Sequence, residues 1–396
     1  MLTKYGRDQT YNVLCDTRYR DESAETTPQE PSTQSKPTTE TGRRTFLRRA
    51  AAGAATGVGL LSGCMAPSSP GGSGEQPAIE ADTPGTEVPE GPKVGVYLGN
   101  EAALQPWESW FGRPVDYYSF DVPTSGWDMY LVDNMPFETP IEPIASEREI
   151  AVTVKMFPPD ETTLNAVAAG DHTDRHRAFA RSLIDHGMAD ATVRIGHEMN
   201  GQWSFDGAVG RPERFVQAWR QVVAAMNAAG GAAFDYVWSP HIGRIDMNPR
   251  DAYPGDEWVD QIGLTVYDRY QQYYPSECDG SCVRELREEN WNRLVNQEFG
   301  LEDWAEFARE HDKPLAFPEY GVVARSWNGV GGGDNPMFFE RFAEWIETNE
   351  DLVAWHNPWC FVAGPHFVGP NRLHVSEEYQ PHPDASQTFR ALFGGG

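Results

Sequence analysis

From Val94 onward, short apolar runs alternate with segments whose apolar residues recur every three to four positions. The runs have the length of strands and the segments between them have the length of helices. The predicted strands are 94–98, 129–132, 150–156, 191–195, 234–238, 262–266, 315–317 and 352–355. Eight strands separated by helices predict an α/β fold of the (β/α)8, or TIM-barrel, type.

The helical segments support this prediction. The clearest is 212–229, which Gly230 ends; its apolar stripe consists of Phe215, Trp219, Val222 and Met226. A second is 336–347, with Phe338, Phe342 and Trp345 on one face. The alternative is a doubly wound open sheet, but no glycine-rich nucleotide-binding turn follows the first predicted strand. The barrel is therefore the favoured fold.

Composition allows a large core. The chain has 396 residues, of which 39% are hydrophobic and 12% aromatic, and it contains 13 tryptophans. Most of these tryptophans are expected to pack in the core. Carbohydrate enzymes also use tryptophan faces as platforms under sugar rings, because those faces are apolar and polarisable.

The charge is strongly negative, with a formal net charge of −27. Residues 1–92 hold 9 basic and 12 acidic residues, which leaves 23 basic and 47 acidic residues in 93–396. Such a field repels nucleic acid and anionic membrane surfaces. The lysines of 93–396 are Lys93, Lys155 and Lys313. An acidic, lysine-poor surface is typical of proteins from very salty cells, where salt screens the repulsion; we expect a halophilic source, with an ordinary acidic protein as the alternative.

The amino-terminal part resembles an export signal. Residues 1–40 are polar and aperiodic, which predicts disorder. In 41–64, Arg43 and Arg44 precede a short apolar run that ends in Leu-Ser-Gly-Cys64. This pattern resembles a twin-arginine signal with a lipobox, and the resemblance implies lipidation of Cys64 after cleavage. The run is too short to span a membrane. The alternative is an amphipathic or buried helix, and the 40 upstream residues leave open a start downstream of Met1.

A linker rich in Pro, Gly, Ser, Thr and Glu follows at 65–92. We expect it to tether a monomeric folded domain, 93–396, to a lipid anchor on the outer face of the membrane. The twin-arginine machinery would export this secreted, cell-surface protein.

The cysteines predict one disulfide. Cys278 and Cys282 flank a short turn, and in an exported protein a disulfide is favoured there. No CxxC or HxxxH partner lies nearby, so no zinc or other metal is predicted. Cys360 is expected to be a buried strand thiol.

Two predicted strands end in glutamate. The strand 191–195 breaks into a polar loop with Glu198 beside His197, and Trp203 follows five positions later. The strand 315–317 leads into Glu319. The carboxyl ends of barrel strands form one mouth, and strands 4 and 7 lie on opposite sides of it. A single strand-end glutamate is more often a cap or salt-bridge partner, but two facing carboxyls are what glycoside hydrolysis needs.

Further motifs make a family resemblance specific. They are Arg194, His197-Glu198, Asn200-Gly201, Trp203, Val237-Trp238-Ser239-Pro240, Tyr253-Pro254-Gly255-Asp256, Val259-Asp260, Ile262-Gly263-Leu264, Tyr267-Asp268 and Glu319-Tyr320-Gly321. In this order they resemble glycoside hydrolase family 26 over residues 94–390. That family is mostly β-mannanases, with some lichenases and xylanases. The resemblance implies a retaining mechanism without metal or organic cofactor, with Glu198 as acid/base and Glu319 as nucleophile.

The resemblance also implies roles for the neighbouring side chains. His197 would hydrogen-bond in the site and tune its protonation, Tyr267 would hydrogen-bond Glu319, and Arg194 would favour the charged form of Glu319. Trp203 would line the substrate cleft. Trp359 or Trp355, with Trp359 preferred, would be the sugar platform; core packing is the alternative for each tryptophan. Asp256, Asp260 and Asp268 are expected to be loop caps and salt-bridge partners.

The chain departs from the resemblance at the third strand. Many relatives carry a Trp-His pair there, and this chain has Val154-Lys155-Met156-Phe157-Pro158. Trp107 and Trp110 are candidates to replace the lost contact. The leading hypothesis is a retaining endo-β-glycanase acting on β-mannan, with β-glucan or xylan next. The alternatives are a non-catalytic carbohydrate-binding lipoprotein and a transporter's substrate-binding lipoprotein.

Overall fold

The computed structural model describes residues 91–269, 274, 278, 280–325, 331–361 and 381–395. The predictions for the signal segment, for lipidation of Cys64 and for the linker lie outside these residues. The chain divides into two units, Met1–Val88 and Pro89–Gly396, and the described residues belong to the second.

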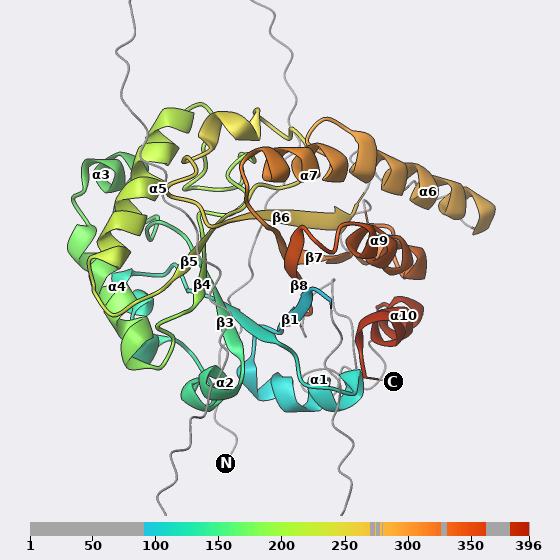
Figure 1. Ribbon diagram of the computed structural model, residues 1–396, viewed down its shortest axis with the longest axis horizontal. Coiled ribbons are helices and arrows are strands. Elements are labelled where there is room, and N and C mark those ends of the chain that lie inside the picture. The colour runs from blue at the N-terminus through green and yellow to red at the C-terminus, as the bar shows by residue number, and fades with distance from the viewer. Residues whose placement is uncertain are drawn as a thin grey trace, which may run out of the picture. The chain divides into compact units, whose positions relative to one another are not determined.

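Eight parallel strands close into a barrel in the order of the sequence (Figure 1). They are β1 (Lys93–Tyr97), β2 (Tyr117–Asp121), β3 (Glu149–Val154), β4 (Thr192–Ile195), β5 (Asp235–Trp238), β6 (Gln261–Asp268), β7 (Leu315–Val322) and β8 (Val353–Pro358). Pairing of β1 with β8 completes the ring. The predicted (β/α)8 fold is confirmed.

Helices surround the barrel (Figure 1). They are α1 (Leu104–Phe111), α2 (Glu142–Glu147), α3 (Leu164–Ala169), α4 (Thr173–Asp185), α5 (Pro212–Asn227), α6 (Gly280–Asn296), α7 (Leu301–Glu310), α9 (Pro336–Thr348) and α10 (Pro383–Phe393). Short 3-10 turns are η1 (Glu101–Ala103), η2 (Trp127–Tyr130), η3 (Val132–Asn134) and η4 (Pro249–Ala252). The predicted helices at 212–229 and 336–347 are confirmed as α5 and α9.

Helix α5 illustrates why these segments are helical. Pro212 occupies its first turn, where the missing N–H costs no hydrogen bond. The predicted stripe is completely buried against the barrel. Burial of each such side chain contributes about 1.5–3 kcal/mol, so tertiary packing rather than helix propensity fixes this element.

The predicted second strand is wrong. Residues 129–132 lie in η2 and η3, and the observed strand is β2, with the sequence Tyr-Tyr-Ser-Phe-Asp. The backbone N–H of Val132 bonds to the Ser182 hydroxyl of α4 at 2.8 Å instead of to a strand. The Tyr130 ring packs against Phe179 of the same helix. The apolar run is thus a helix-packing segment, and aromatic β2 was missed.

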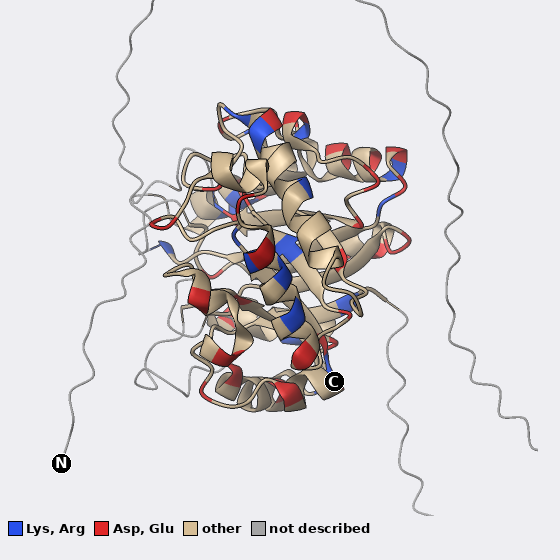
Figure 2. Ribbon diagram, turned by 90° about the vertical axis from the view of Figure 1, so that its left-hand side faces the viewer, with Lys and Arg blue, Asp and Glu red and all other residues tan. Residues whose placement is uncertain are grey.

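The predicted disulfide is present, because Cys278 and Cys282 are bonded to each other. Cys360 is a free, buried thiol just after β8, as expected. In the described ranges, no helix is long and apolar enough to span a bilayer, and no group of three His, Cys, Asp or Glu side chains could hold a metal ion. Acidic and basic residues are interspersed over the outer helices (Figure 2).

Candidate active site

Glu319 owes its inward orientation to a β-bulge in β7. Against β6, the pairs are Gly263 with Ala316 and Thr265 with Glu319, so β7 holds one extra residue. The register with β8 shifts at the same place. Pro318 lies there, and a proline cannot donate a ladder hydrogen bond.

The bulge changes which side chains face the barrel interior. Phe317 and Tyr320 are three positions apart, yet both rings pack against Phe342 of α9, with centroids at 4.9 and 4.4 Å. In a regular strand, Glu319 would share the outward face with Phe317, because side chains alternate. The extra residue places Glu319 inside the barrel instead.

Arg194 binds this carboxylate from below. It is 2% exposed, and its Nη1 donates to Glu319 Oε2 at 2.7 Å. Its Nη2 donates to Thr265 Oγ1 at 2.6 Å and its Nε to Ser239 Oγ at 2.9 Å. The Tyr267 hydroxyl donates to Glu319 Oε1 at 2.7 Å. Both oxygens of Glu319 are therefore held by donors from β4 and β6.

Glu198 lies in a different environment, on the loop after β4. Its backbone has φ 54°, a left-handed conformation that costs a non-glycine residue free energy. Its N–H donates to the Ser239 carbonyl at 2.8 Å. The half-buried carboxylate accepts a hydrogen bond from Trp203 Nε1 at 2.6 Å, and the Trp203 side chain is 41% exposed.

Asn200 fixes the strained loop to its neighbour. Its Oδ1 accepts from the His241 N–H at 2.9 Å, and its Nδ2 donates to the carbonyls of His241 and Gly243. Asn200 is fully buried. The loops after β4 and β5 are thereby joined, which keeps Glu198 in its left-handed conformation.

Lys155 occupies the place of the departure at the end of β3. Its Nζ donates to the His197 carbonyl at 3.1 Å and to Ser204 Oγ at 2.9 Å, and lies 3.4 Å from Asp206. The lysine thus ties the end of β3 to the loop that carries Glu198.

The pKa order of the two glutamates is the reverse of the expected one. Burial raises the pKa of Glu319, and the charge of Glu198 adds to the rise, which Arg194 and Tyr267 oppose without cancelling it. Burial also acts to raise the pKa of Glu198, but the charges of His241 and Arg194 and the Trp203 hydrogen bond lower it below the usual value. The expectation of an ionised Glu319 beside a protonated Glu198 fails for the unliganded site.

His197 also differs from expectation. Its Nδ1 is buried and has no hydrogen-bond partner among the described residues. Burial, and then the charges of Lys155 and Arg194, lower the pKa of His197 well below its ordinary value. The ring is therefore neutral near pH 7, and it is the His197 carbonyl that makes the observed contact.

Two polar residues of the mouth were missed. Asp121 ends β2; burial, and then the charge of Glu319, raise its pKa to about 7, which Arg194 opposes. His241 follows Pro240, and its Nδ1–H donates to the Ile242 carbonyl at 2.9 Å. A correct second strand would have indicated Asp121, and a polar residue just beyond the fifth strand was the signal for His241.

The predicted tryptophans separate into two groups. Trp359 follows β8 at the mouth, is partly exposed, and stacks on Tyr97 with centroids 3.6 Å apart. Trp355 is buried, stacks on Tyr117, and donates its Nε1–H to Gln261 at 2.8 Å. Because Tyr117 and Gln261 begin their strands, Trp355 closes the opposite end of the barrel and cannot be the platform. Trp107 is buried core, and Trp110 packs against it.

The three aspartates have structural partners. Asp256 accepts from Tyr253 and contacts His311, and Asp260 accepts from the Tyr236 N–H. Asp268 is buried and accepts from Tyr274, Asn290 and Asn335. These contacts agree with the expected roles as caps and bridging residues.

The comparison with family models gives one match. Residues 179–283 match the model described as glycosyl hydrolase family 26. The segment contains β4, β5 and β6, and therefore Arg194, Glu198 and Tyr267. Glu319 lies beyond it.

Solved structures share the fold. A modular endo-β-1,4-mannanase from Cellulomonas fimi has 20% identity, a TM-score of 0.52, and coverage of 76% of this chain and 70% of that one. A double mutant of a Cellulomonas fimi endo-β-1,4-mannanase gives 20% identity, a TM-score of 0.51 and the same coverage. A β-mannanase from Bacteroides ovatus has 17% identity and a TM-score of 0.49, with coverage of 76% and 88%. At such identities the likeness establishes the barrel fold alone.

Proposed function

We propose that this chain is a retaining glycoside hydrolase of family 26 that cleaves β-1,4-mannan-type polysaccharide internally. The observation that carries the proposal is the pair Glu198 and Glu319 in one barrel mouth. Glu319 is aligned by Arg194 and Tyr267, and Glu198 is aligned by Trp203. The family match, which spans Glu198, supports the same conclusion.

In the proposed mechanism, Glu319 attacks the anomeric carbon and forms a glycosyl-enzyme ester. Glu198 donates its proton to the departing oxygen, so the first product leaves as an alcohol. A water then gives its proton to Glu198 while its oxygen displaces Glu319. Arg194 and Tyr267 orient the nucleophile, and both hydrogen bonds stabilise the carboxylate that is released in the second step.

Substrate binding would use the aromatic residues around the mouth. Trp203 and Trp359 lie on the β4 and β8 sides and offer exposed ring surface for sugar stacking. The fold shared with mannanases favours mannan, and Lys155 at the departure keeps β-glucan and xylan as alternatives within the family.

A non-catalytic binding protein is the alternative from another class. The buried ion pair of Arg194 and Glu319 argues against it, because desolvation of two charges is costly and a binding groove does not require it. A transporter's binding lipoprotein is disfavoured by the closed single barrel.

The test is release of reducing ends from glucomannan, lichenan and xylan. Fast release of oligosaccharides from glucomannan, with the first product in the β-configuration by NMR, is expected. Inverted product would refute the retaining mechanism, which requires a carboxyl separation of about 5–5.5 Å. Absence of hydrolysis of all three would refute the enzyme.

We also propose that the protein of this halophile-type composition is exported and lipid-anchored at the cell surface. Support comes from Arg43-Arg44 and from Cys64 after the short apolar run. Replacing both arginines by lysine should block secretion, and Cys64→Ala should release soluble protein. Unchanged surface attachment of the Cys64→Ala protein would refute the anchor.

A further inference from the structure

A cavity of about 360 Å³ adjoins the two catalytic carboxyls. Two of its walls contact them directly. Trp203 donates a hydrogen bond to Glu198, and Tyr267 donates one to Glu319. A ligand in this cavity would therefore lie beside the reacting bond of the proposed function, on which this inference rests.

The cavity is positively charged. Arg269 and Arg293 line it, and no Asp or Glu is among the described residues that do so. In residues 93–396 acidic side chains outnumber basic ones by 47 to 23. Two guanidinium groups lining one cavity without a carboxylate are therefore against the composition of the domain.

Arg269 has a fixed backbone and a free charge. It directly follows β6, its N–H donates to the Tyr267 carbonyl at 2.8 Å, and it bridges to Gly331. Within the described part of the chain, its guanidinium has no hydrogen-bond or ion-pair partner. A partly buried guanidinium gains most from a planar anion that accepts two hydrogen bonds.

Neighbouring side chains support the arginine and offer further polar atoms. Arg293 of α6 donates to the Arg269 carbonyl at 3.3 Å, to Asn290 Oδ1 at 2.7 Å and to Gln297 Oε1 at 3.2 Å. Gln297 Nε2 and His241 Nε2 also belong to residues of this cavity, and both are buried without a partner among the described residues. The polar lining is thus incompletely satisfied.

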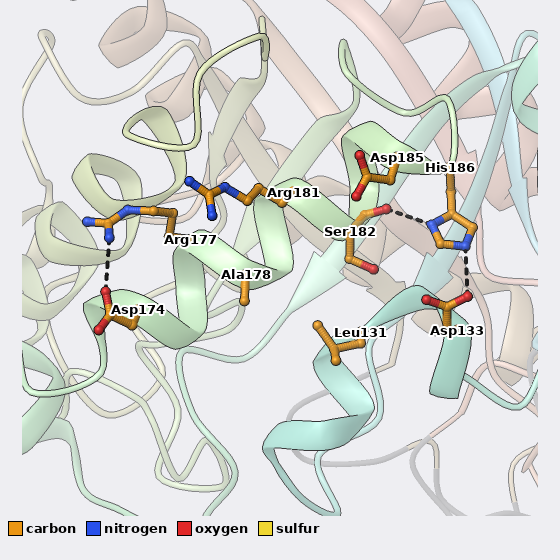
Figure 3. A pocket seen from close by; sticks show the side chains of 9 residues that line it. All are labelled: Leu131, Asp133, Asp174, Arg177, Ala178, Arg181, Ser182, Asp185 and His186. Carbon is orange, nitrogen blue, oxygen red and sulfur yellow. Dashed lines mark hydrogen bonds and ion pairs between the residues drawn. The ribbon is translucent and has the colours of Figure 1, made fainter.

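A second arginine-lined cavity shows the ordinary arrangement. This cavity, of about 430 Å³, lies between η3 and α4 (Figure 3). Arg177 and Arg181 line it together with Asp133, Asp174 and Asp185. Arg177 bonds to Asp174 at 2.9 Å. Its cations have carboxylates beside them, which the cavity next to Trp203 lacks.

We propose that the cavity beside Trp203 binds an anionic substituent, a carboxylate or a sulfate, on the leaving-group side of the substrate. Glu198 protonates the leaving group, and the cavity wall formed by Trp203 is bonded to Glu198. The exposed ring of Trp203 supports the sugar, and Arg269 binds its anionic group. The natural substrate is then a β-glycan that carries acidic substituents rather than a neutral one.

The test compares three substrates of equal chain length: neutral, carboxymethylated and sulfated β-1,4-mannan. We expect kcat/KM to be about tenfold higher for at least one anionic substrate, since one charge-assisted contact has this effect. Which of the two is preferred distinguishes a carboxylate from a sulfate site.

Arg269→Gln should abolish most of this preference, so that the ratio of anionic to neutral kcat/KM falls about tenfold. Arg177→Gln, in the second cavity, is the matched control and should retain the wild-type ratio. Equal rates on all three substrates, or a preference that survives Arg269→Gln, would overturn the proposal.

Failure of the proposed function has a different signature, because no substrate would then be hydrolysed. In that case the same three oligosaccharides are titrated calorimetrically into wild type and Arg269→Gln. Tighter binding of an anionic oligosaccharide that Arg269→Gln removes supports the cavity independently of turnover. Equal affinities in both proteins overturn it.

Discussion

Glu319 and Glu198 occupy the same barrel mouth but are held in opposite ways. Glu319 lies within a strand, is 8% exposed, and accepts hydrogen bonds on both oxygens from Arg194 and Tyr267. Glu198 lies on a left-handed loop residue and is held by half-exposed Trp203. A nucleophile needs a fixed position, whereas an acid/base must exchange protons with substrate and water, and the two environments suit these different tasks.

The largest expected effect follows from removing the fixed carboxylate. Glu319→Gln should lower kcat on every substrate at least about a thousandfold, because no glycosyl-enzyme can form. Steady-state kinetics on activated and natural substrates checks this. The amide can still accept from Tyr267, so thermal unfolding serves as the folding control. Turnover of an activated glycoside near the wild-type rate would remove Glu319 as nucleophile.

Removal of the loop carboxylate should have a selective effect. Glu198→Ala should lower kcat on polysaccharide by about 10²–10⁴-fold and spare glycosyl-enzyme formation from substrates with an activated leaving group, which need no proton. Added azide should then speed release of the intermediate as a glycosyl azide. Equal loss on both substrate types without azide rescue would show that Glu198 is not the acid/base.

Tyr267→Phe should change the pH dependence through Glu319. Loss of the hydroxyl donor raises the already elevated pKa of Glu319 further, because the charged form loses a hydrogen bond. Activity requires ionised Glu319 and is lost as pH falls through its pKa. The acidic limb of kcat/KM should therefore move to higher pH, with about a tenfold to hundredfold loss at the optimum. An unmoved limb would mean that Tyr267 does not act on Glu319.

Lys155→Met should loosen the loop of Glu198 without touching Glu319. We expect kcat to fall about threefold to tenfold on polysaccharide, and less on substrates with an activated leaving group. Lys93→Met is the control, because Lys93 pairs with Glu149 at the exposed start of β1. Equal losses on both substrate types would show that Lys155 does not act through the acid/base.

The smallest expected effect concerns Asp121. Its pKa rises from 3.8 to about 7 on folding, so the native state binds this proton more tightly than the unfolded state. Wild-type stability should therefore fall as pH rises from about 4 to about 7. Asp121→Asn should lack this fall and gain about 2 kcal/mol relative to wild type between those limits. Parallel denaturation curves at pH 4 and pH 8 would refute the raised pKa.

Much of the fold could be predicted because it depends on local periodicity. The strands that bear Arg194, Glu198, Tyr267 and Glu319 were each marked by a short apolar run, and the barrel follows from their number and spacing. The second strand was missed because Ser119 interrupts its apolar pattern. That serine is buried, and its hydroxyl donates to the Val96 carbonyl of β1.

The site was predictable where residues follow strand ends and less so where tertiary contacts decide. Trp355 and Trp359 are four residues apart on one strand, and only the register of β8 shows that they lie at opposite ends of the barrel. The pKa order of the glutamates depends on His241, which belongs to another loop and was not considered. Pro318 was visible in the sequence, and a proline inside a strand is a signal for a bulge.

The bulge at Pro318 also sets how high the nucleophile stands in the barrel. A regular strand offers inward positions only at every second residue, about 6.6 Å apart along its axis. One inserted residue gives Glu319 a height between two such steps, still facing inward. Since catalytic groups must be placed within about 0.5 Å, a barrel of regular strands alone could not supply this position. Enzyme designs that transfer Glu319 to another barrel would therefore need the irregular backbone as well as the side chain.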